Sequence, residues 1–131
     1  GSGGLIAGGN GGRVLFIIDE DNDGSGGSII NTGLISANGA YGLIGGAGGN
    51  ISLISDPNND NAASNGTGSN SGPLNTKGGD GQTIGGGGGS ILLQARDIFS
   101  DTTSLVEENP PTSPNVSGGS PGGSAGAVTI R

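Results

Sequence analysis

Short apolar runs recur along this chain, and each run comes directly after a cluster of glycines. The sequence GGNGG-RVLFII begins at Gly8, GGAGG-NISLIS at Gly45, GGGGG-SILLQA at Gly85, and a degenerate copy, GGSAG-AVTIR, at Gly122. The four clusters begin 37, 40 and 37 residues apart, and Val or Ile follows each cluster after one intervening residue. This near-equal spacing indicates an internal repeat, which is typical of proteins that stack one unit on the next.

Alignment of the four copies separates apolar columns from a mixed one. The first strand position holds Val14, Ile51, Ile91 and Val128, and the third position holds Phe16, Leu53, Leu93 and Ile130. The position between them holds Leu15, Ser52, Leu92 and Thr129. Residues i and i+2 of a strand share one face. The first and third columns are therefore predicted to face a core.

Composition adds the fold class. Glycine supplies 33 of the 131 residues, only three residues are aromatic, and good helix formers are scarce. We predict one all-β domain over residues 1–131, a β-solenoid or β-helix of about four glycine-rich repeats of 37–40 residues. Each repeat forms either two coils of about 19 residues or one wide coil with three strands. A glycine-rich β-sandwich or jelly roll is the alternative fold.

Two segments depart from the repeated pattern. Residues 56–73 are mostly polar, and residues 107–123 contain four of the six prolines, which excludes a central strand there. We expect both segments to be loop excursions from the scaffold. Residues 74–76 (LNT) faintly echo residues 30–32 (INT).

The residues that several classes of activity require are absent from this sequence. The chain contains no His and no Cys, so it offers no usual general base and no conventional zinc or copper site. The one lysine, Lys77, precedes Gly78, so the sequence contains no phosphate-binding P-loop. A net charge of −7 disfavours nucleic acid, and no apolar run is long enough for a membrane span. We predict a protein that is not an enzyme and that needs no cofactor beyond a candidate calcium ion.

That candidate calcium site lies in the sequence DEDNDG. Asp19, Asp21 and Asp23, followed by Gly24, match the start of a calcium-binding loop, in which several oxygens meet in a sharp turn. An EF-hand needs Glu at its twelfth position, which here is Ile30, so the prediction is a calcium site in a β-turn. A solvated acidic turn is the alternative. Asn65 and Asn115 are candidate glycosylation acceptors, because their sequons fall in expected loops.

Apolar residues on the face opposite the predicted core are candidates for an interface. They are Leu15, Ile17, Ile54 and Leu92. That face of a sheet is normally polar in a soluble monomer. These residues are therefore either covered within the domain or buried by a partner, and residues 14–18 are the first place to look for that partner.

The motif GGxGG-x-[VI]-x-[LI], together with INTGLISANG at residues 30–39, resembles the glycine-rich repeats of large bacterial cell-surface and secreted proteins. It is similar to the β-helical repeats of filamentous-haemagglutinin-type adhesins, over residues 8–18, 45–55 and 85–95 as well. The resemblance implies an extracellular, non-enzymatic, repetitive β structure used for adhesion or for building filaments. The prolines of residues 110–121 depart from such a uniform β-helix.

We therefore predict a structural subunit of an extracellular filament or surface layer. Its partners are copies of itself, because neither end shows the polar cap that keeps a solenoid soluble. Head-to-tail contact through strands and apolar side chains is the expected mode. The alternative is an adhesin fragment that presents the loops 56–73 and 107–123 to a host receptor or a glycan.

Overall fold

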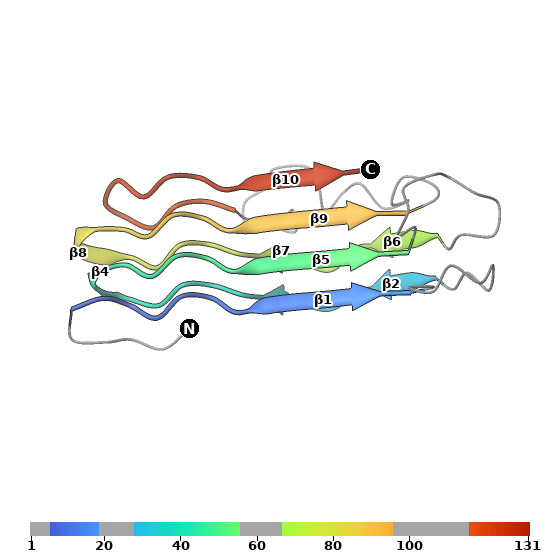
Figure 1. Ribbon diagram of the computed structural model, residues 1–131, viewed down its shortest axis with the longest axis horizontal. Coiled ribbons are helices and arrows are strands. Elements are labelled where there is room, and N and C mark those ends of the chain that lie inside the picture. Colours follow the sequence, from blue (N-terminus) through green and yellow to red (C-terminus); the bar gives the residue numbers. More distant parts are fainter. Residues whose placement is uncertain (1–5, 19–27, 56–66, 96–115) are drawn as a thin grey trace.

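The structure, a computed structural model, describes residues 6–18, 28–55, 67–95 and 116–131 (Figure 1). These residues contain ten β-strands and no helix, so the predicted all-β class is confirmed for the described part. The strands are β1 (Arg13–Ile17), β2 (Ile29–Asn31), β3 (Ile35–Ser36), β4 (Gly42–Ile44), β5 (Asn50–Ile54), β6 (Gly68–Asn70), β7 (Leu74–Asn75), β8 (Gly81–Ile84), β9 (Ser90–Gln94) and β10 (Ala127–Ile130).

All the described strand pairs are parallel. One sheet has the order β1-β5-β9-β10, and three two-stranded sheets pair β2 with β6, β3 with β7, and β4 with β8. Val14 pairs with Ile51, Ile51 with Ile91, and Ile91 with Val128, which is the alignment that the repeat predicts. These ladders join residues 37 to 40 positions apart. Among the described residues, no ladder has the offset of about 19 that two coils per repeat would give.

The strands form two layers with the hydrophobic core between them. The first layer consists of residues 8–18, 45–55, 85–95 and 122–131, and the second layer of residues 28–44, 67–84 and 116–121. We call the part of one repeat at one level of the stack a rung. In Figure 1 the rungs of the first layer follow one another in chain order from β1 to β10.

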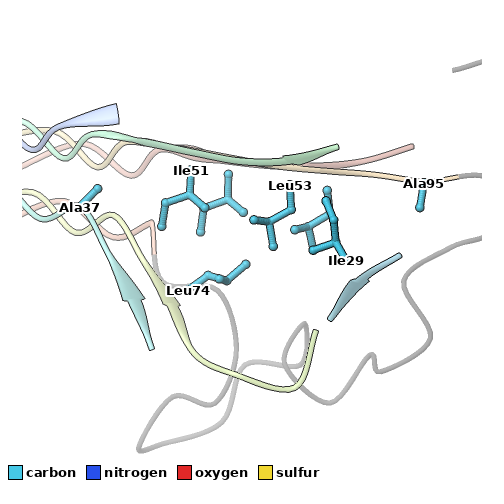
Figure 2. Packing of buried hydrophobic residues seen from close by; sticks show 8 residues of the cluster. Ile29, Ala37, Ile51, Leu53, Leu74 and Ala95 are labelled. Carbon is cyan, nitrogen blue, oxygen red and sulfur yellow. The ribbon is translucent and has the colours of Figure 1, made fainter. Parts of the chain in front are cut away.

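Buried aliphatic side chains of the two layers point toward one another. Figure 2 shows Ile51 and Leu53 of the first layer opposite Leu74 and Ile29 of the second. Ile51, Leu53, Leu74, Ile91 and Leu93 are at most 1% exposed. Their burial confirms that the first and third columns face the core in the inner rungs. In the outer rungs the same columns are open, because Phe16 is 53% exposed and Ile130 is 39% exposed.

Parts of the two predicted loop excursions belong to the scaffold instead. Residues 67–73 include β6, which pairs in register with β2. Val116 packs against the core, and the N–H of Gly78 donates to the carbonyl of Ser117 (2.9 Å). Pro121 does not prevent this stacking, because residues 116–121 form no regular strand and contribute single backbone bonds. Residues 56–66 and 107–115 lie outside the described residues.

The similarity between residues 30–32 and residues 74–76 does not correspond to a strand pairing. Asn31 pairs with Asn70, and Leu74 pairs with Ile35. The backbone ladders hold every rung of the second layer at an offset of 39 or 40 residues, so a local resemblance at another offset cannot be satisfied. The side-chain Nδ2 of Asn31 donates to Oδ1 of Asn70 (2.7 Å), which adds a polar contact to the true register.

Candidate assembly interface

The glycine clusters are the places where the two layers come closest. The N–H groups of Gly45 and Gly48 donate along the stack, to the carbonyls of Ile84 (2.9 Å) and Gly87 (2.8 Å). Those of Gly46 and Gly49 donate across to the second layer, to the carbonyls of Ala40 (2.9 Å) and Ala37 (2.7 Å). In both directions the donors are three residues apart, which is the period of a polyproline II-type helix.

Such a helix has no hydrogen bonds of its own, so its backbone bonds to its neighbours. The cross-layer bonds form one continuous zigzag through the stack, with six N–H···O distances of 2.8–2.9 Å. In order, the zigzag runs through Gly9, Ala40, Gly46, Gly79, Gly86, Gly119 and Gly123. At the glycine clusters the two layers are therefore joined by backbone hydrogen bonds, whereas at the strands they are joined by packing of aliphatic side chains.

Close approach explains why these positions are glycine. A Cβ at Gly49 would overlap the carbonyl oxygen of Gly12, and a Cβ at Gly89 would overlap that of Gly49. Every third position of a cluster faces neither the neighbouring rung nor the other layer. Gly87 holds this position, and a Cβ there would lie 3.8 Å from the nearest atom, the carbonyl oxygen of Ser124. In the other rungs this third position holds Asn10, Ala47 and Ser124.

This three-residue period is a sequence signal that alignment by clusters alone overlooks. It appears as side chains at the third and sixth positions of GGNGGR and GGAGGN and at the sixth position of GGGGGS. Positive φ angles explain little, because among the described residues only Gly122 has one, at 73°. Glycine is needed for interlayer contact rather than for turns.

The two outermost strands of the first layer have free edges among the described residues. β1 pairs only with β5, and β10 pairs only with β9. At the β1 edge a Cβ added to Gly12 would meet no atom within 4 Å. At the β10 edge Val128 is 40% exposed although its column faces the core in the inner rungs. Both edges therefore present backbone groups and half-exposed apolar side chains that a further strand can cover.

The predicted interface residues share one face of the four-stranded sheet. Leu15, Ile17, Ile54 and Leu92 lie at strand positions that alternate with the core-facing columns. Leu15 is 42% exposed, and the other three are half-buried. Stacking within the sheet brings Ile17 next to Ile54. Together they form an apolar surface on the outside of the first layer, and its role as an interface stays a prediction.

Among the residues that the structure describes, Asp80 is the titratable group whose pKa is shifted by its neighbours in the stack. The backbone N–H of Ser120, on the next rung, donates to its Oδ1 (2.8 Å), and Nζ of Lys77 lies 3.2 Å away. These two partners hold the pKa of Asp80 below its ordinary value of 3.8. Because the pair is exposed, its contribution to the stability of this turn is expected to be small.

The other candidate site residues lie outside the described residues. This applies to Asp19, Asp21 and Asp23 of the calcium motif and to the glycosylation candidates Asn65 and Asn115. Within the described ranges, no three His, Cys, Asp or Glu side chains gather closely enough to hold a metal ion. No helix in those ranges is long and apolar enough to cross a membrane.

Comparison with known proteins gives this chain no relative. No protein-family model, no characterised protein and no solved structure matches it. Its function is therefore inferred from the arrangement of its own residues.

Proposed function

We propose that this chain is a parallel β-solenoid segment that builds an extracellular filament or surface layer by end-to-end association of copies. The observation that carries the proposal is the identical register of successive rungs, with Val14, Ile51, Ile91 and Val128 in one column. In a solenoid each rung buries its apolar face against its neighbours only. A stack of this kind grows by adding rungs, whichever chain supplies them.

The energetics of the stack favour growth at its edges. The inner strands β5 and β9 bury their core residues fully, whereas Phe16 in β1 and Ile130 in β10 keep 53% and 39% of their surface in contact with solvent. Burial of a large apolar side chain is worth roughly 1.5–3 kcal/mol. A further strand at either edge would gain this burial together with a row of backbone hydrogen bonds.

The extracellular or cell-surface location is part of the same proposal. It rests on the resemblance of the glycine-rich repeats to those of bacterial surface proteins. The side chains of the described residues suit a structural role, because they are mostly small, uncharged or aliphatic.

Electron microscopy of the purified chain over a range of concentrations tests this function. We expect unbranched fibres, and fibre diffraction with an axial reflection at about 4.8 Å, the spacing of paired strands. A chain that sediments as a monomer at every concentration, and that shows no fibres, would contradict the proposal. Fibres without the axial reflection would contradict the solenoid stacking.

An adhesin is the second candidate, and one observation favours it. The parallel strands β1, β5 and β9 lie side by side in one sheet, so their carboxyl ends lie at the same end of it. Residues carried at one end of a rigid scaffold are a common way to present a binding surface.

Deletion of residues 56–66 and 96–115, each replaced by a short Gly-Ser linker, separates the two functions. A filament former still assembles without these segments, whereas an adhesin loses binding to its ligand. A printed array of glycans is a suitable probe, read with the full chain and with the deletion variant side by side. Retained assembly with no glycan binding in either chain favours the filament.

A further inference from the structure

The first rung carries a glycine that no contact within the described residues requires. Gly12 belongs to the same column as Gly49, Gly89 and Gly126. In those three, a Cβ would overlap a carbonyl oxygen of the preceding rung, whereas a Cβ at Gly12 would meet nothing within 4 Å. Gly12 therefore occupies a position at which the other rungs place a glycine against a carbonyl oxygen of the preceding rung. Among the described residues, no preceding rung supplies that oxygen to Gly12.

The backbone repeats this relationship. The residue after each of these glycines donates its N–H to the glycine carbonyl of the preceding rung, as Asn50 does to Gly12 (3.1 Å) and Ala127 to Gly89 (3.2 Å). In the first rung the equivalent donor is the N–H of Arg13, and in the last rung the equivalent acceptor is the carbonyl of Gly126. The two ends of the first layer therefore carry complementary groups of one hydrogen-bond series.

We propose that a second copy of this chain docks its strand β10 against the free edge of β1, parallel and in register. The N–H of Arg13 then donates to the carbonyl of Gly126 of the second copy. Val14 packs on Val128 and Phe16 on Ile130 of that copy, which covers the half-exposed ends of both core columns. This inference rests on the proposed end-to-end association and names its contact.

The side chains at the joint are compatible with a second copy. Continued columns would place Arg13 over Ala127 and Leu15 over Thr129, so no two like charges meet at these positions. The pairing also follows the alternation of the sheet, because core-facing residues meet core-facing residues. A shift by one residue would put Phe16 on the outer face, which disfavours any other register.

The contact is confined to the first layer, and this gives a matched control. β10 extends the first layer one rung beyond residues 116–121 of the second layer. Docking in register therefore leaves the place of one rung open between residues 116–121 of the second copy and residues 28–40 of the copy that supplies β1. Gly33 faces that open place. A Cβ at Gly33 meets nothing within 4 Å, although a Cβ at its equivalent Gly72 would overlap the carbonyl of Gly33.

The first experiment compares Gly12→Ala with Gly33→Ala by sedimentation and by thermal unfolding. We expect both variants to unfold at the wild-type temperature, because neither Cβ meets an atom of its own chain. Gly12→Ala is expected to weaken association at least tenfold, whereas Gly33→Ala associates like the wild type. Loss of association in Gly33→Ala as well would overturn the proposal, because it would show that a complete rung covers this end.

The second experiment is a cross-link that does not depend on the stability of a glycine variant. The chain has no cysteine, so the double variant Arg13→Cys/Ala127→Cys places the only two thiols. Within one chain these positions are three rungs apart, about 14 Å, which is too far for a disulfide. Between docked copies they are one rung apart, so mild oxidation is expected to give a ladder of covalent oligomers.

The control for the cross-link is Ser36→Cys/Ala127→Cys, which is expected to stay monomeric on a non-reducing gel. If the wild type associates but the Arg13→Cys/Ala127→Cys ladder does not form, the docking is wrong while the filament proposal survives. If the wild type does not associate at any concentration, the proposed function itself fails. These two failures are therefore distinguishable.

Discussion

Gly49 lies directly against Gly12 of the preceding rung, and a Cβ at position 49 would overlap the carbonyl oxygen of Gly12. The same relationship joins Gly89 to Gly49 and Gly126 to Gly89. This column of the stack is thus closed to side chains at positions 49, 89 and 126. Its spacing is set by backbone atoms, and the rungs can approach as closely as the strands of the sheet beside them require.

The first prediction compares Gly49, which lies against the backbone of the preceding rung, with Gly87, which does not. Gly49→Ala is expected to lower the free energy of unfolding by about 3 kcal/mol or more, because backbone must move to admit the methyl group. Gly87→Ala is the matched control. Its Cβ would make an ordinary contact of 3.8 Å, so its stability is expected to equal or slightly exceed that of the wild type. Urea unfolding followed by circular dichroism measures both, and equal losses would contradict the steric explanation.

The second prediction concerns a buried hydroxyl. Thr76 is fully buried, and its Oγ1 has no hydrogen-bond partner among the described residues. Thr76→Val keeps the branched shape and removes the unsatisfied group, so it is expected to stabilise the fold by about 1 kcal/mol. Thr83→Val serves as the control, because Oγ1 of Thr83 donates to the carbonyl of Leu43 (2.9 Å) and its removal gains nothing. A lower melting temperature for Thr76→Val would show that the hydroxyl has a partner.

The third prediction concerns a buried asparagine whose amide is bonded. Asn70 is fully buried, accepts from Nδ2 of Asn31 (2.7 Å) and donates to the carbonyl of Gly72 (3.1 Å). Asn70→Ala is expected to cost about 2 kcal/mol, because it leaves both partners without this bond. A double-mutant cycle with Asn31→Ala isolates the side-chain pair, and we expect a coupling energy of about 1 kcal/mol. A coupling of zero would assign the loss to packing alone.

The fourth prediction is a pH dependence at the turn between β7 and β8. The pKa of Asp80 is lowered on folding, so the folded protein favours the carboxylate. Its contribution to stability is present above the ordinary pKa of 3.8 and is lost as the pH falls through the lower pKa of the folded state. We expect a difference in melting temperature between the wild type and Asp80→Asn at pH 7, and we expect it to shrink as the pH falls below 3.8. A difference that persists at low pH would show that the charge is not its cause.

The repeat and its register were accessible to sequence reasoning because strand alternation and cluster spacing are local signals. The columns that begin at Val14 and Phe16 follow from counting, and backbone pairing adopts the same alignment. The second layer was less accessible. Its strands β3 and β7 have only two residues each and carry no alternation to read. Their places are decided by the first layer, which fixes the level of every rung.

The sequence by itself determined the all-β class, the 37- to 40-residue repeat and the inward-facing columns, because these depend on residue spacing along one strand. Only the tertiary structure decided that residues 67–73 and 116–121 belong to the scaffold, and that every third residue of a glycine cluster escapes the contact between layers. These outcomes depend on which backbone segment of another rung or of the other layer lies opposite each residue. For a chain whose contacts are made so largely by backbone atoms, the side-chain pattern carries little information about that choice.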